Sequence, residues 1–366
     1  MSYVRKNPVM CIAFAAALIS CFLVPPDMEY LNYFDMKTLT CLFCTLAVVC
    51  AFKDISFFRI IAGRIVSFFT TIRSAIIALV YITFIGSMLI ANDMALITFL
   101  PLGYYVITST NNRRYLAFTF IMQNIAANLG GMLTPFGNPQ NLYLYTYFNI
   151  SNTEFVKIMF LPFFISIVFI TICCMFVKND KLVIAEECDI KLDKKKAFIY
   201  SVLFVLSIII VFRVMPYWIG LIIITSILFI YDRHALTEVD YPLLLTFCAF
   251  FVFSGNVARI TLVKDLLEQI IDKHTLLFGV LSCQIISNVP SAILLSHFTD
   301  NYQQLLVAVN IGGAGTLIAS LASLITFREY SKNEPTKTGS YIRKFSAYNF
   351  AILAVLIMSM GIVLGF

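Results

Sequence analysis

The sequence predicts an all-α polytopic membrane protein made of two inverted repeats, each with a re-entrant hairpin and a broken transmembrane helix. Of the 366 residues, 60% are hydrophobic and only 13% are charged, a composition typical of helical membrane proteins. Two segments, 128–141 and 310–323, carry Asn, Gly, Gly and Thr in matching columns. Each follows a second polar interruption of an apolar run, around Asn92 and around Asn288. Together these observations predict a duplicated fold.

The apolar runs predict the order of the spans. Continuous spans are expected at 8–24, 37–52, 158–177, 197–212, 214–231, 241–256 and 345–366, and broken spans at 115–150 and 303–327. The first run follows Arg5 and Lys6, as in a signal peptide. No small-residue cleavage site precedes the Pro25-Pro26 turn, so we expect a retained first helix.

Basic residues predict the orientation, because Lys and Arg accumulate on the cytoplasmic side of membrane proteins. An N-terminus inside the cell places most of the 26 Lys and Arg on that side. We therefore expect a multi-pass protein of the cell inner (plasma) membrane with its N-terminus in the cytoplasm.

The segments around the two Asn residues are predicted to be hairpins. About 15 residues separate Lys273 from Asn288, and about 12 separate Asn288 from Asp300. At about 1.5 Å per residue neither limb crosses a hydrocarbon core of about 30 Å. The first segment is long enough to span on either side of Asn92, so its assignment as a hairpin depends on the duplication.

Three parts follow from this topology. The first inverted repeat is expected at 1–177, a cytoplasmic linker and connecting helix at 178–213, and the second inverted repeat at 214–366. The hairpins then enter from opposite sides. The charged run 178–196 is expected to be a solvated linker.

Paired interruptions in apolar segments point to a transporter whose binding site lies where the repeats meet. Helix N-termini there favour an anion, and freed carbonyls favour Na⁺. An Asn side chain can serve either ion, because it offers both a carbonyl and an amide. Gly-Gly pairs let the backbone approach closely. Their alternative role is close helix packing, which is common in membranes.

Asp93 is an acidic residue inside a predicted membrane segment, where a charge is costly and usually faces a cavity or a partner. One interpretation is a Na⁺ or H⁺ site. The alternative is a helix cap, with the carboxylate accepting from the amides that open the next helix. Both stay open from the sequence alone.

Four stretches resemble motifs of a known group: IANDMALITFLP, NLGGMLTPFGNPQN, ISNVPSAILL and VNIGGAGTLIASLASL. They resemble the ion transporter superfamily, which includes divalent anion:sodium symporters, citrate transporter-like proteins, arsenite permeases and a branch of sodium/proton antiporters. The closest likeness is to its short bacterial permeases. In its carboxylate transporters each tip bears Ser-Asn-Thr, which contacts substrate and helps build a sodium site. Here the tips read Ala91-Asn92-Asp93 and Ser287-Asn288-Val289, so only Asn is common to both.

Residues and resemblance together predict a secondary active transporter. It is expected to move a small anion, a carboxylate, with Na⁺ or H⁺ by elevator-type alternating access. Sodium/proton antiport and efflux of arsenite or another oxyanion are the alternatives. No soluble-enzyme motif is present, so no enzyme activity is expected. We expect no cofactor and no nucleic-acid partner; membrane lipid surrounds the chain, and the resemblance implies a homodimer.

The motifs supply the candidate site residues. Candidates for the substrate are Asn92, Thr134, Asn138, Ser287, Asn288 and Thr316. Candidates for the coupling ion are Asn92, Asp93, Gly130, Gly131, Asn288, Gly312 and Gly313, with Na⁺ expected at Asn92, Asp93 and Asn288.

Overall fold

The computed structural model describes residues 8–181, 192–271 and 273–365. The regular elements in these ranges are helices. One isolated antiparallel β-bridge pairs Thr71 with Lys181. Within these described ranges, six helices are long and apolar enough to cross a membrane: Met36–Asp54, Ile72–Ile90, Arg113–Leu133, Asn152–Met175, Arg233–Ala258 and Pro335–Leu364. The predicted all-α polytopic class is confirmed.

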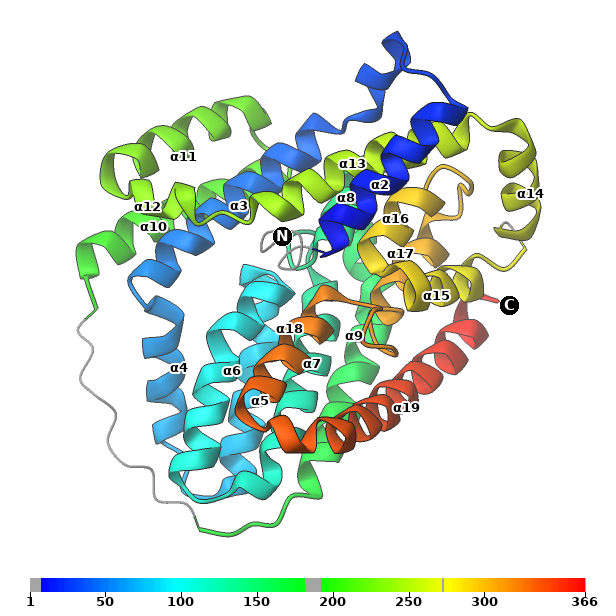
Figure 1. Ribbon diagram of the computed structural model, residues 1–366. Helices are drawn as coiled ribbons and strands as arrows, with labels where there is room; N and C mark the ends of the chain where they lie inside the picture. Colours follow the sequence, from blue (N-terminus) through cyan, green and yellow to red (C-terminus); the bar gives the residue numbers. More distant parts are fainter. Residues whose placement is uncertain (1–7, 182–191, 272, 366) are drawn as a thin grey trace.

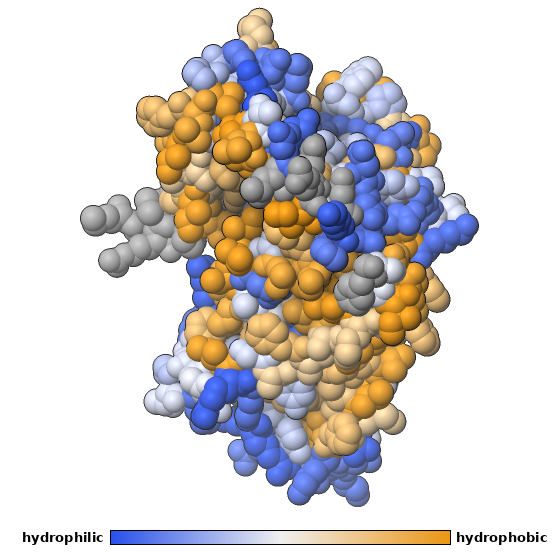
Figure 2. Space-filling view, turned by 90° about the vertical axis from the view of Figure 1, so that its right-hand side faces the viewer, coloured by the Kyte–Doolittle hydropathy of each residue, from blue (hydrophilic) through white to orange (hydrophobic). Residues whose placement is uncertain are grey.

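Surface hydropathy agrees with this class. Figure 2 shows hydrophobic residues over the middle of one face, with hydrophilic residues gathered at its lower end and in its upper part. Such a band is what a lipid-facing surface between two wet ends requires.

The first half of the chain runs from α2 to α9. Its helices are α2 (Pro8–Leu23), α3 (Met36–Asp54), α4 (Phe57–Ser67), α5 (Ile72–Ile90), α6 (Asn92–Ser109), α7 (Leu116–Gly130), α8 (Pro139–Tyr147) and α9 (Asn152–Met175). Short 3₁₀ turns lie at η1 (Met28–Tyr33), η2 (Arg113–Tyr115) and η3 (Gly131–Leu133).

The second half follows a linker that lies partly outside the described residues. Its helices are α10 (Lys194–Val211), α11 (Tyr217–Tyr231), α12 (Arg233–Thr237), α13 (Tyr241–Ala258), α14 (Thr261–Ile271), α15 (Thr275–Ile286), α16 (Asn288–Leu295), α17 (Tyr302–Ile311), α18 (Leu321–Asn333) and α19 (Thr338–Leu364), with a 3₁₀ turn η4 (Pro335–Lys337).

The two halves use the same order of elements. A short helix, α4 or α14, leads into a hairpin, α5–α6 or α15–α16. A broken helix follows, α7–α8 or α17–α18, and then a long helix, α9 or α19. The predicted spans do not include α4 and α14, because helices of 11 residues are too short to cross a membrane. The inverted relation of the halves stays a prediction.

Several helix ends differ from the predicted spans. Helix α9 begins at Asn152 rather than at 158, and α19 begins at Thr338 rather than at 345. The second broken span extends to Asn333 instead of 327. In each case polar residues extend the helix beyond the apolar run that hydropathy detects.

The helices form two packed groups (Figure 1). In one group α2 packs on α13, and α3 packs on α10 and α11. In the other the hairpins pack on the broken helices, α5 on α7 and α15 on α17. Helix α18 of the second half packs on α6 and α7 of the first, and α16 packs on α8. The two halves therefore interlock around the hairpin tips.

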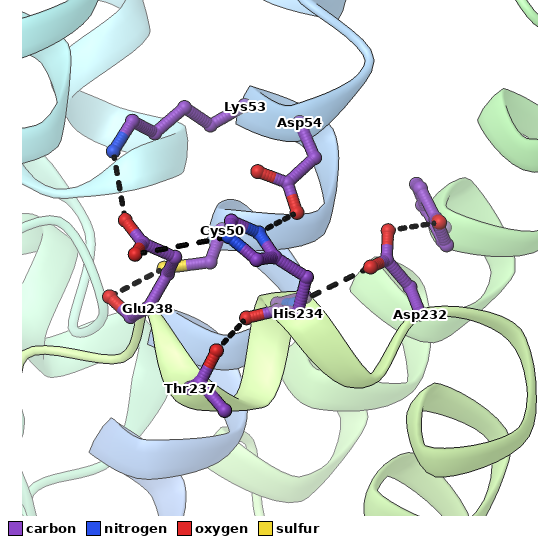
Figure 3. Close-up of polar contacts among 9 residues, drawn as sticks. Cys50, Lys53, Asp54, Asp232, His234, Thr237 and Glu238 are labelled. Atoms are coloured by element: carbon purple, nitrogen blue, oxygen red, sulfur yellow. Dashed lines mark hydrogen bonds and ion pairs between the residues drawn. The ribbon is translucent and has the colours of Figure 1, made fainter.

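Polar contacts fasten α12 to the end of α3 (Figure 3). The His234 ring Nδ1 lies 3.0 Å from a carboxylate oxygen of Asp54, and Lys53 Nζ lies 3.7 Å from a carboxylate oxygen of Glu238. The Cys50 thiol donates to the Glu238 backbone carbonyl at 3.4 Å. These contacts fix the start of α13, which follows α12 directly.

Candidate functional site

The two hairpin tips share one backbone conformation. Ala91 has φ 65° and ψ 154°, and Ser287 has φ 75° and ψ 159°. Positive φ is uncommon for residues with a Cβ, and such strain collects at functional sites. The next residue is Asn at both tips, and its Oδ1 accepts the following backbone amide at 2.9 Å. The predicted likeness of the tips around Asn92 and Asn288 therefore extends to their geometry.

Each break is tied to its hairpin by the matched Thr. Thr134 Oγ1 donates to the Met88 carbonyl at 2.8 Å, and Thr316 Oγ1 donates to the Gln284 carbonyl at 3.1 Å. Both carbonyls lie four residues before a tip Asn, where a helix end frees its acceptors. The hydroxyl groups of Thr134 and Thr316, two candidates for substrate binding, therefore donate their protons to backbone carbonyls of the hairpins.

Amide side chains satisfy the carbonyls that each break frees. In the first half, Asn141 Nδ2 donates to the carbonyls of Gly131 and Thr134, both at 3.2 Å. In the second half, Gln284 Nε2 donates to the Gly312 carbonyl at 2.9 Å. Unwound backbone at membrane depth needs such partners. Neither amide was among the predicted site residues.

The first Gly of each pair packs against its hairpin. A Cβ on Gly130 would lie 2.3 Å from the Phe84 carbonyl oxygen, and one on Gly312 would lie 2.9 Å from Cys283 Sγ. Phe84 belongs to α5 and Cys283 to α15, the first limbs of the two hairpins. Gly130 and Gly312 therefore lie where close packing on the hairpins leaves little room for a Cβ, and their role at the coupling ion stays a prediction.

The second Gly of each pair faces polar side chains. A Cβ on Gly131 would lie 2.4 Å from Asn138 Oδ1. One on Gly313 would lie 3.2 Å from Asn288 Nδ2 and 3.8 Å from Asn128 Oδ1. At these two positions the missing side chain brings the backbone close to site residues.

Hydrogen bonds of Asn side chains link the two broken helices to each other. Asn128 Oδ1 accepts from Asn92 Nδ2 at 3.2 Å and from Ser320 Oγ at 2.7 Å. Asn310 Oδ1 accepts from Asn138 Nδ2 at 3.3 Å. Asn128 and Asn310 occupy matching columns in the sequence, yet they were not among the predicted ligands. Ser320, in the column of Asn138, was missed as well.

A cavity of about 320 Å³ opens beside the tips. Four helix N-termini contribute to its lining: α6, α8, α16 and α18. The opposite wall comes from α2 and α13 and is mainly apolar. Four of the predicted residues line the cavity together: Asn92, Asp93, Ser287 and Asn288.

Three charged residues line the same cavity: Asp93, Asp240 and Arg328. Oδ1 of Asp93 is buried without a hydrogen-bond partner among the described residues. The backbone amide of Asp93, in the first turn of α6, donates to Asn92 Oδ1, and α6 has no side-chain cap, so the structure gives no support to Asp93 as the cap. Asp240 caps α13 by accepting the Leu243 amide at 3.0 Å. The sequence gave no sign that Asp240 or Arg328 would reach the site.

Similarity to known proteins agrees with this geometry. The family model described as citrate transporter matches residues 3–304. The uncharacterized transporter MJ0456 of Methanocaldococcus jannaschii is 35% identical over 321 residues, which are 87% of this chain and 88% of that protein. The inner membrane protein YbiR of Escherichia coli is 28% identical over 287 residues, 74% of each chain. The chain thus belongs to the citrate transporter family and is a multi-pass membrane transporter.

Proposed function

We propose that this transporter moves a small anion, a carboxylate, coupled to Na⁺ or H⁺ and without a cofactor. The observation that carries the proposal is the meeting of four helix N-termini at one cavity. Each N-terminus carries partial positive charge and backbone amides that lack a helical acceptor. Such termini bind anionic groups of substrates in transporters.

Side chains around the tips extend this anion site. The Asn92 and Asn288 side chains bring amide groups to the cavity, and Ser287 adds a hydroxyl. Arg328, which is exposed, adds a cation to the lining. The proposed substrate therefore places a carboxylate at the tips, with Arg328 attracting anions to the cavity.

Movement is proposed to follow the division into two groups of helices. The hairpins, the broken helices, α9 and α19 move as one body against a scaffold of α2, α3, α10, α11 and α13. The mainly apolar wall from α2 and α13 supports this, because apart from Asp240 and Thr246 it offers apolar side chains, which can slide without breaking hydrogen bonds. Helices α4 and α14 connect the scaffold to the two hairpins. The scaffold also supplies the interface of the proposed homodimer in the plasma membrane.

Transport by the purified protein in proteoliposomes tests the function. We expect a labelled carboxylate from a panel that includes citrate to accumulate when an inward Na⁺ or H⁺ gradient is imposed. Collapse of the gradient by an ionophore should abolish accumulation, and protein-free liposomes give the background. If no carboxylate accumulates under either gradient, the proposed function is wrong.

A sodium/proton antiporter is the second candidate. Two carboxylates, Asp93 and Asp240, line the cavity, and an antiporter needs a carboxylate for which Na⁺ and H⁺ compete. The same vesicles, loaded with a pH-sensitive dye, distinguish the two functions. Proton movement driven by Na⁺ without any carboxylate would favour antiport.

A further inference from the structure

We propose that Asp93 and Asp240 together hold the coupling cation, Na⁺, where the first hairpin meets α13. The inference deepens the proposed function, because it names the place and the ligands of the coupling ion. It adds a residue of α13 to a site that the sequence motifs placed entirely on hairpins and breaks.

Polar side chains from three helices line one cavity. Asp93 comes from α6, Gln140 from α8 and Asp240 from α13. Gln140 is only 1% exposed, and its Oε1 has no hydrogen-bond partner in the described part of the chain. Its Nε2 donates to Asn310 Oδ1 at 3.4 Å, which leaves Oε1 as the unused end. Oδ1 of Asp93 is buried and unpartnered too.

A cation explains these unused acceptors. Buried polar atoms without partners are rare, because burial without a hydrogen bond costs free energy. Asp93 and Asp240 line the same cavity, and two like charges beside an apolar wall repel each other. Na⁺ would offset that repulsion, and hard cations prefer oxygen ligands of this kind.

Asp240 is held in place for this role. One carboxylate oxygen caps α13 through the Leu243 amide, so the other is the atom proposed to face the cation. Before it, α12 is fastened to the end of α3 (Figure 3). After it, Tyr241 donates its hydroxyl to the Leu236 carbonyl at 2.8 Å. A cation between Asp93 and Asp240 would therefore join the first hairpin to the scaffold.

Binding of ²²Na⁺ to the detergent-purified full chain tests the site without relying on transport. The variants are Asp93→Asn, Asp240→Asn and the double variant. Asn caps helices about as well as Asp, so Asp240→Asn removes the charge and keeps the start of α13. Asp35→Asn is the matched control, because Asp35 caps the scaffold helix α3 in the same manner and does not line the cavity.

We expect Asp240→Asn to raise the half-saturating Na⁺ concentration at least tenfold, as Asp93→Asn does, while Asp35→Asn binds like the parent. The double variant should lose much less than the sum of the two single losses, because both act on one ion. Parent-like binding by Asp240→Asn, or no ²²Na⁺ binding by the folded parent, would overturn the proposal. Carboxylate uptake is measured separately, so Na⁺ binding without any uptake would reject the anion function and leave the cation site standing.

Discussion

The same strained backbone conformation occurs at one residue of each hairpin tip. Ala91 and Ser287 both hold a backbone conformation that glycine adopts most easily. Each costs on the order of 1–3 kcal/mol, which the surrounding packing must offset. What the strain achieves is visible at the next residue, where Asn starts a new helix with its side chain at the cavity. The same backbone conformation at both tips therefore places an Asn at the start of a helix in each hairpin.

Replacing either tip Asn should abolish transport and leave the protein folded. Asn92→Ala removes a hydrogen bond to Asn128, and Asn288→Ala removes the acceptor of the Val289 amide. Each loss costs about 1–3 kcal/mol of stability, which an otherwise intact core tolerates. Uptake in proteoliposomes and size-exclusion profiles in detergent measure the two effects.

The matched control is Asn349→Ala. Asn349 is fully buried in α19 and bonds to the Phe345 carbonyl of its own helix. It should cost similar stability and keep transport. Full transport by both tip variants would remove the site assignment.

Asp93→Asn separates a coupling role from a structural one. The substitution removes the charge with almost no change in shape, so ion dependence should vanish or transport should stop. If Asp93 only capped α6, Asn would serve nearly as well and the loss would be a few tenths of a kcal/mol. Flux measured against Na⁺ concentration and pH checks this, with Asp35→Asn beside it. Superimposable profiles for Asp93→Asn and the parent would refute coupling through this residue.

At the scale of elements, each broken helix packs closely on its hairpin, and the first Gly of each pair lies at that contact. Gly130→Ala would place a Cβ against the Phe84 backbone, which cannot move aside as a side chain could. We expect the free energy of unfolding to fall by about 1–3 kcal/mol. Thermal unfolding in detergent, with its midpoint compared across variants, gives the measurement.

Gly339→Ala is the control for that comparison. Gly339 lies in α19, and a Cβ there would meet nothing within 4 Å. Because Ala is the better helix former by up to about 1 kcal/mol, this variant should be as stable as the parent or more so. Equal stability of Gly130→Ala and Gly339→Ala would show that the close approach at Gly130 carries no energetic weight.

The sequence predicted those elements whose signal is local. Asn, Gly and Pro interrupt apolar runs visibly, so the hairpins and breaks could be located, and their matching columns indicated a repeat. Gln140, Asp240 and Ser320 could not be found this way. In the sequence Asp240 has the pattern of an ordinary helix cap before Tyr241. It lines the cavity only because α13 packs on α16. Such placement depends on contacts between distant helices, which no local pattern encodes.

At the scale of the whole molecule, the site belongs to both halves at once. Bonds between Asn128 and Ser320 and between Asn138 and Asn310 link residues more than 170 positions apart. Without the other half, Asn128 would lose the bond from Ser320, and Asn138 would lose its bond to Asn310. We therefore infer that the halves fold into one cooperative unit around these bonds.

The ends of the two hairpins that lie away from the tips, here called their bases, contact opposite ends of α9. Near its C-terminal end, Arg73 of the first hairpin donates to the Val177 carbonyl at 2.6 Å. At its N-terminal end, Tyr302, which follows the second hairpin, donates to Glu154 at 2.6 Å. Helix α9 has 24 residues, or about 36 Å, enough to cross the hydrocarbon core of about 30 Å. This geometry makes the predicted inverted arrangement testable.

A single Cys introduced at each hairpin base should report opposite sides of the membrane. Arg113 follows the first hairpin and Asp300 the second, and both are exposed. With the N-terminus in the cytoplasm, Arg113→Cys should react with an impermeant maleimide only from the cytoplasmic side, and Asp300→Cys only from outside. The parent serves as background, because its described cysteines are buried or only partly exposed. Labelling of both positions from one side would contradict the inverted repeat, since α9 could not then separate the two bases across the bilayer.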